Sequence, residues 1–175
     1  MRIRVSQELR QPVGSESVME LRQRSLFLDD GADLSGLEGT ARMLRTDRGL
    51  LVTVAARATL RGTCSRCLAA AESPIEIGFQ EEFIPVIDPV SGKHITPDEI
   101  DEGFVIDGEL VLDLGEPLRQ YALMSEPSKP LCRPDCAGLC PTCGANLNEG
   151  PCGCPPAAED RWGALAALNK EKEGS

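Results

Sequence analysis

The sequence is poor in aromatic residues and contains a single histidine. Phe, Trp and Tyr together make up 3% of the 175 residues, so we expect a mainly aliphatic core. The base-stacking platforms of many single-strand RNA-binding proteins are not evident. His94, the one histidine, lies in an acidic stretch, which is typical of a solvated surface residue. Because no GxSxG, P-loop or dinucleotide-binding glycine pattern occurs, we predict that the protein is not an enzyme and expect no small-molecule substrate.

Long apolar runs are also absent from the sequence. None approaches the ~18 residues that a membrane-spanning helix needs. The first residues, MRIRVSQELRQPVGSES, lack the continuous apolar stretch of ~7 to 15 residues that is typical of a secretory signal. We therefore expect a cytoplasmic protein with no membrane partner. In a reducing cytosol, closely spaced cysteines are more often metal ligands than disulfides.

Charge is unevenly distributed along the chain, whose formal net charge is −10. Residues 1–61 contain 10 arginines and 8 acidic residues, whereas residues 62–126 contain 3 basic and 14 acidic residues. An acidic segment repels phosphate, so a contact with RNA is expected in the first third of the chain. The acidic middle is instead suited to a basic protein. The alternative is that these charges only keep the surface soluble.

Alternating apolar and polar residues predict a β-rich body. The expected strands are residues 2–5, 37–46, 50–61, 75–83, 104–106 and 109–112. Within the strand at 50–61, one face is wholly apolar and is expected to be buried, namely Val52, Val54, Ala56, Ala58 and Leu60. Asp47-Arg48-Gly49 and Asp107-Gly108 are hairpin signals. Residues 17–28 fit a helix or a strand, and the pattern does not decide between them.

Two short helices are expected after the strands. Asp113 followed by Glu116 is typical of an N-cap with a capping box, so the first helix is expected to begin there and to stop before Pro127. Asp160, or Glu159 beside it, is expected to begin a helix near the C-terminus.

The predicted fold class is α+β. It comprises an antiparallel β-rich body with a few short helices and a small C-terminal cysteine-rich zinc-binding module. A linker, SEPSKP, separates the two expected domains. Residues 1–126 form the β-rich domain that carries the first CxxC, and residues 127–175 form a zinc-knuckle tail with a short helix. The tail contains too little apolar area to fold unaided, so metal binding is expected to supply its folding energy.

Eight cysteines occur in four close pairs. In order, the pairs are Cys64 with Cys67, Cys132 with Cys136, Cys140 with Cys143, and Cys152 with Cys154. A CxxC turn lets two thiolates reach one ion while backbone N–H groups point at the sulfurs. Four thiolates around one ion favour zinc, with an iron–sulfur cluster as the alternative, and leave no open position for water. We therefore predict two structural Zn2+ ions.

The spacing favours one partition of the cysteines into two sites. In CPTCGANLNEGPCGC, a CxxC, a glycine-containing arm and a tight CxC follow one another, which groups the third and fourth pairs. The first and second pairs then share the other ion, which would fasten the tail to the body. A competing partition joins the second and third pairs and leaves the first pair with the fourth.

Cys64-Ser65-Arg66-Cys67 has an alternative interpretation as the site of a thiol redox or zinc-dependent enzyme that uses Cys64 and Cys67. A thioredoxin-type site needs its CxxC between a strand and a helix. The residues that follow, LAAAESP, are soon interrupted by Pro74, which disfavours a helix there. The structural interpretation of this pair is therefore preferred.

Three segments of the chain are distinctive when taken together. They are GTCSRCLAAAESPIEIGFQEEFIP, DLGEPLRQYALMSEPSKPLCRPDCAGLCPTCGANLNEGPCGC and EDRWGALAAL. The first resembles the CxRCL motif and following acidic EEF of the YceD family, the large ribosomal RNA subunit accumulation proteins. The second resembles the C-terminal half of that family, and the third resembles its end. The resemblance covers roughly residues 60–170.

The resemblance implies a non-catalytic role in the accumulation or processing of 23S rRNA and in assembly of the large ribosomal subunit. The expected partners are precursor large-subunit rRNA, a basic ribosomal protein, or both. No catalytic residue is implied. The cysteines carry over as metal ligands, and Arg66 within CxRC is a candidate for binding RNA or a partner. The alternative for Arg66 is an ion pair with Glu81 or Glu82 that holds the hairpin together.

Overall fold

The computed structural model describes residues 1–27, 33–88, 91–95 and 104–155. The chain divides into two compact units. The first comprises Met1–Ser65 with Ala69–Cys132, and the second comprises Arg66–Leu68 with Arg133–Ser175. Within the described ranges, no helix has the length and apolar character needed to cross a bilayer.

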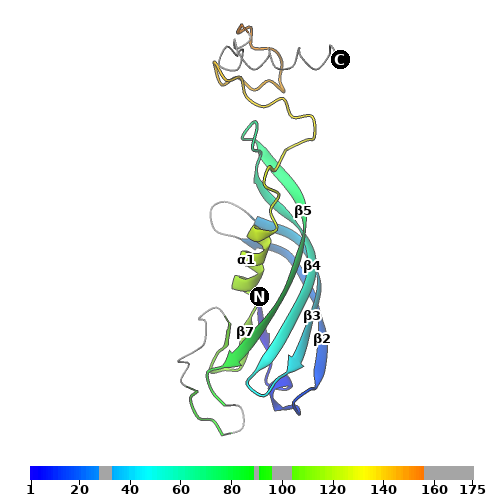
Figure 1. Cartoon of the computed structure of the whole chain (residues 1–175), viewed down its shortest axis with the longest axis vertical. Helices are drawn as coiled ribbons and strands as arrows, with labels where there is room; N and C mark the ends of the chain where they lie inside the picture. The colour runs from blue at the N-terminus through cyan, green and yellow to red at the C-terminus, as the bar shows by residue number, and fades with distance from the viewer. Residues whose placement is uncertain (28–32, 89–90, 96–103, 156–175) are drawn as a thin grey trace, which may run out of the picture. The chain divides into compact units, whose positions relative to one another are not determined.

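The first unit is built on a seven-stranded sheet, drawn in Figure 1. Its strands are β1 (Arg2–Arg4), β2 (Glu16–Phe27), β3 (Asp33–Arg45), β4 (Leu50–Thr63), β5 (Ala70–Pro85), β6 (Val105–Ile106) and β7 (Val111–Asp113). The order across the sheet is β1-β7-β6-β5-β4-β3-β2. Strands β2 to β5 form a long antiparallel meander. The predicted antiparallel body is thus mostly confirmed, although β5 and β6 pair in parallel.

The alternation of side chains in β4 determines which face of the sheet is buried. Val52, Val54 and Leu60 are at most 2% exposed, whereas Thr53, Ala55 and Arg57 are exposed. The predicted apolar face is therefore confirmed, with Ala56 half-buried. Residues 17–27, part of the segment 17–28 for which the sequence allowed either helix or strand, lie in the edge strand β2.

Helix α1 (Gly115–Met124) lies on one side of the curved sheet (Figure 1). Its Leu118 and Ala122 are fully buried in the same core as the inner face of the strands. Tyr121 stacks on Phe79 of β5 with ring centroids 4.7 Å apart, and its hydroxyl donates a hydrogen bond to Glu81. This hydrogen bond raises the pKa of Tyr121. The helix is thus fixed to β5 by stacking, burial and a polar contact.

The start of this helix differs from the prediction. Its N-cap is Leu114, which makes no side-chain capping bond, so Asp113 is not the cap. Asp113 Oδ1 instead accepts the Gly115 N–H at 2.8 Å. Glu116 pairs with Arg119 at 2.7 Å, and hydrogen bonds from Arg119 and then Gln120 lower its pKa to about 2. The end at Met124 agrees with the predicted stop before Pro127.

The described part of the chain is mostly β. It contains the single α-helix α1 and one 3-10 turn, η1 (Glu8–Arg10), so the α+β class is supported only in this coarse sense. The helix predicted to begin at Asp160 or Glu159 lies outside the described residues.

Strands β3 and β4 approach each other very closely at Gly39. A Cβ at this position would lie 2.3 Å from the Ala55 carbonyl oxygen and 2.5 Å from the Ala56 Cα. Both are backbone atoms, which cannot move aside as a flexible side chain does. The pairing register shifts just before this point, between Ser35 and Glu38, and the shift strengthens the local twist of the strands.

Gly39→Ala is therefore expected to destabilise the protein by about 2–3 kcal/mol, because the added methyl group forces the strands apart. Gly78→Ala in β5 is the matched control, since its Cβ would meet nothing closer than 3.9 Å. That variant is expected to leave the free energy of unfolding unchanged or raise it by up to ~1 kcal/mol. Urea unfolding measures both, and equal midpoints for the two variants would contradict the close approach.

Candidate metal centres

The connection between β4 and β5 is a tight turn that carries the first CxxC. The Cys64 N–H donates to the Ala69 carbonyl at 2.7 Å and closes the turn. Leu68 adopts a positive φ of 62°, a left-handed conformation that is rare for a bulky residue. The Ser65 N–H donates to the Pro130 carbonyl at 2.8 Å, which places the chain just before Cys132 beside the turn.

The first cysteine set comprises Cys64, Cys67, Cys132 and Cys136, whose four sulfurs lie within 4.8 Å of one another. Three of the four residues are buried, and Cys132 is exposed. Four thiol sulfurs at this separation match the ligands that one tetrahedral metal ion takes from a protein.

Arg66 lies within the second unit and binds its backbone. The guanidinium Nη1 donates to the Cys136 carbonyl at 2.8 Å, and the Arg66 carbonyl accepts the Leu139 N–H at 3.2 Å. The alternative ion pair with Glu81 or Glu82 is wrong. Those residues align with Val52 and Leu51, at the opposite end of the β4–β5 pair from the CxxC turn. A role for Arg66 in binding RNA or a partner stays a prediction.

The second set comprises Cys140, Cys143, Cys152 and Cys154, and its four sulfurs also lie within 4.8 Å of one another. The Cys140 N–H donates to Ala145 at 2.8 Å, and the Gly144 N–H donates back to Cys140 at 2.9 Å. Gly144 and Gly153 have φ values of +74° and +71°, which only glycine adopts readily. These bends bring both cysteine pairs of the set together.

The pKa values of Cys140 and Cys154, two thiols of the second set, are shifted in opposite directions. Backbone N–H groups of Cys143 and Thr142 point at the Cys140 sulfur and lower the pKa of this thiol to about 6. Hydrogen bonding with the neighbouring Cys143 and Cys152 thiols raises the pKa of Cys154 to about 12. Thiolates packed this closely repel one another, so ionisation of the whole set requires a cation.

Asn148 connects the arm of the second set with a cysteine of the first. Its Nδ2 donates to the Cys136 sulfur at 3.5 Å. Its Oδ1 accepts hydrogen bonds from the Ala137 N–H and the Arg133 guanidinium, both at 2.8 Å. A hydrogen bond to a ligating sulfur orients the ligand and favours its thiolate. The cysteine spacing gave no signal of this contact, because it joins residues 12 positions apart in different CxxC-type segments.

The structure brings together the two sets that the spacing favours. The competing partition, with Cys64 and Cys67 beside Cys152 and Cys154, does not occur in the described part of the chain. Each set offers four sulfurs, which fill a tetrahedral shell and leave no position for a reacting water. The arrangement is therefore suited to a structural metal ion and not to a hydrolytic one.

The sheet and the two sets define a β protein with two candidate four-thiol metal centres. Residues 52–169 match the family described as "Large ribosomal RNA subunit accumulation protein YceD". The chain therefore belongs to the YceD family, and the resemblance in the cysteine motifs is confirmed.

Several relatives are uncharacterised mycobacterial proteins. One, from Mycobacterium tuberculosis (strain ATCC 25618 / H37Rv), is 32% identical over 143 residues, which cover 82% of this chain and 65% of the relative. Another, from Mycobacterium leprae (strain TN), is 31% identical over 123 residues, which cover 70% of this chain and 54% of the relative. The chain thus spans less than two thirds of their length. No solved structure matches it significantly.

Single cysteine substitutions test the two sets independently. We expect the wild type to retain two metal ions per chain, and Cys67→Ser and Cys143→Ser each to lose one, because three thiolates hold a tetrahedral ion poorly. Ser65→Ala, an exposed neighbour of Cys67, is the control and should retain both ions. Elemental analysis with thiol counting before and after chelation gives the numbers. Wild-type protein with eight freely reactive thiols and no metal would contradict the assignment.

Asn148→Ala is expected to weaken metal retention by the first set by roughly 10- to 100-fold, because Cys136 loses the donor that orients its sulfur. Asn148→Asp keeps the oxygen acceptor and loses the donor, so it should weaken retention at least as much. Glu149→Gln changes the exposed neighbouring residue and should have no effect. Competition with a metal-binding dye measures all three, and wild-type retention by Asn148→Ala would exclude the positioning role.

Proposed function

We propose that this protein is a non-catalytic ribosome biogenesis factor that supports accumulation of 23S rRNA and assembly of the large ribosomal subunit. The observation that carries the proposal is the family match over residues 52–169, a range that contains all eight cysteines. The family description itself names accumulation of the large-subunit rRNA. The finer role, in processing or assembly, is our inference from that description.

Both cysteine sets are proposed to hold structural Zn2+. Zinc prefers four thiolates in a closed tetrahedral shell, whereas catalytic zinc sites keep one position for water. Cys64, Cys67 and Cys136 are at most 7% exposed, so little of the first set is accessible to a substrate. The ions would stabilise the fold and supply no chemistry.

The alternative of a redox or zinc-dependent enzyme at Cys64 and Cys67 is less consistent with the geometry. A catalytic thiol must be accessible to its substrate, and Cys64 is 0% exposed. The pair is followed by Leu68 and Ala69 and then by β5, so no helix begins beside either thiol. Two further sulfurs lie within 4.8 Å, which suits metal binding better than a redox dithiol.

The proposed direct partner is a basic ribosomal protein, with precursor rRNA as the second candidate. Residues 62–126 carry 14 acidic residues against 3 basic ones, which favours a basic surface. Several arginines of the first third are already paired with acids, which makes them less available to phosphate. These pairs are Arg22–Glu20, Arg42–Glu16, Arg57–Glu38 and Arg61–Glu72.

A cytoplasmic location is part of the proposal, because ribosome precursors mature there in bacteria.

Depletion of the protein in its own host tests the role. We expect mature 23S rRNA to fall relative to 16S rRNA and large-subunit precursors to accumulate. Wild-type protein and Ser65→Ala should restore the ratio, whereas Cys67→Ser and Cys143→Ser should restore it poorly because they fold less well. An unchanged ratio of 23S to 16S rRNA in depleted cells would contradict the proposed function.

Cosedimentation with large-subunit precursors identifies the partner class. Association should weaken as salt increases, because the proposed contacts are between charged surfaces. Retention on particles after mild ribonuclease treatment supports a ribosomal protein as the direct partner, and release supports RNA. Association that is insensitive to salt would contradict an electrostatic contact of either kind.

A further inference from the structure

Strand β2 is a long, regular edge of the sheet. It is last in the strand order and spans 12 residues, ESVMELRQRSLF, without proline or glycine. In the described part of the chain, it pairs only with β3, so its other side presents unpaired backbone N–H and C=O groups. Such an edge is a template on which another strand can pair.

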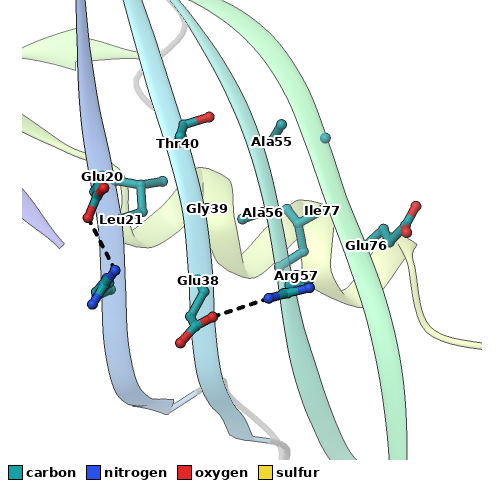
Figure 2. A pocket seen from close by; sticks show the side chains of 12 residues that line it. Glu20, Leu21, Glu38, Gly39, Thr40, Ala55, Ala56, Arg57, Glu76 and Ile77 are labelled. Carbon is teal, nitrogen blue, oxygen red and sulfur yellow. Dashed lines mark hydrogen bonds and ion pairs between the residues drawn. The ribbon is translucent and has the colours of Figure 1, made fainter.

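The outer face of the sheet carries a row of alternating charge that ends at this edge. Arg57 lies opposite Glu76 on one side and opposite Glu38 on the other, and Glu38 lies opposite Arg22 of β2. Figure 2 shows this face of the sheet with the Glu38–Arg57 pair marked, and the two charged groups are 3.4 Å apart. The row therefore ends on Arg22, which pairs with Glu20 of its own strand at 3.4 Å and has no cross-strand acid on its outer side among the described residues.

The charges of β2 change sign at its centre. Glu16 and Glu20 precede Leu21 on the outer face, and Arg22 and Arg24 follow it. An antiparallel strand of the same sequence, centred on Leu21, would therefore present the opposite charge at each central position. Because the charges of β2 are self-complementary, a second copy of the chain fits this edge.

We propose that β2 pairs antiparallel with β2 of a second copy about a two-fold axis at Leu21. Glu20 then lies directly opposite Arg22 of the second copy, and Arg22 lies opposite its Glu20. The alternating row continues across the interface without a break. Opposite charges directly across an antiparallel pair stabilise it, and each interface contains this pair twice.

Neighbouring registers are disfavoured by the same charges. Centring the pair on Glu20 or on Arg22 keeps two opposite-charge pairs but adds a like-charge pair at the centre, Glu20 with Glu20 or Arg22 with Arg22, which the register centred on Leu21 lacks. A shift of the pairing by one residue turns the half-buried Met19 and buried Leu21 to the solvent side of the joined sheet. The register centred on Leu21 avoids both penalties.

Charged residues on an edge strand commonly prevent association. Here they have opposite signs on the two sides of Leu21, so the centred register pairs opposite charges and contains no like-charge pair. Val18, which is 62% exposed, would lie opposite Arg24 of the second copy and be covered by its aliphatic stem. The proposal concerns self-association and does not depend on the proposed ribosomal role.

Sedimentation equilibrium of the full chain tests the proposal. We expect a monomer–dimer equilibrium for the wild type, and Glu20→Arg and Arg22→Glu should each weaken the dimer by roughly tenfold or more, since two opposite-charge pairs become like-charge pairs. An equimolar mixture of the two variants should form a heterodimer of near wild-type affinity, because every pair is again opposite in charge. Glu76→Arg, which also places like charges together in the row but lies on β5, should dimerise as the wild type does.

Hydrogen exchange of the wild type provides a measurement that needs no variant. Amide protection within residues 16–27 should increase with protein concentration, while protection in β4 should stay constant. A wild type that is monomeric throughout, with β2 exchange independent of concentration, would overturn the proposal and leave the edge to another protein. A dimer that both single variants retain would also overturn it, since association would then use another surface.

Discussion

The clustering of eight thiols into two sets of four is the constraint on which the rest of the structure depends. From residue 133 to residue 155, the buried hydrophobic side chains are those of Cys136 and Cys140 alone, so this segment has almost no apolar core of its own. Four sulfurs within 4.8 Å cannot all ionise without a cation between them. A bound metal ion would resolve both problems, because it would neutralise the thiolates and contribute roughly 10–16 kcal/mol to folding, as in other such modules.

Different interactions stabilise the sheet and the thiol sets. The sheet is stabilised by aliphatic burial on its inner face and by the stacking of Tyr121 on Phe79, which fixes α1. Its outer face carries charge pairs, such as Glu38 with Arg57, whose guanidinium groups are already engaged by an acid. The hairpin of β4 and β5 carries the first CxxC in its turn. The same strands therefore supply a core and present two of the candidate metal ligands.

Features governed by local geometry could be predicted from the sequence. The alternation in β4 identified its buried face, and the spacing of the cysteines identified the two sets, because side-chain period and CxxC turns are properties of short segments. Features that depend on distant packing could not be predicted. The parallel pairing of β5 with β6, the bond from Asn148 to Cys136 and the start of α1 at Gly115 all depend on contacts that no short pattern encodes. The alternative ion pair of Arg66 with Glu81 or Glu82 was wrong for the same reason.

The most direct measurement of the central claim is X-ray absorption at the zinc edge on protein purified from its own host without added metal. The account predicts zinc in a first shell of four sulfurs at about 2.3 Å, with no nitrogen or oxygen ligand. An average shell that contains nitrogen or oxygen, or folded protein that contains no metal, would contradict it.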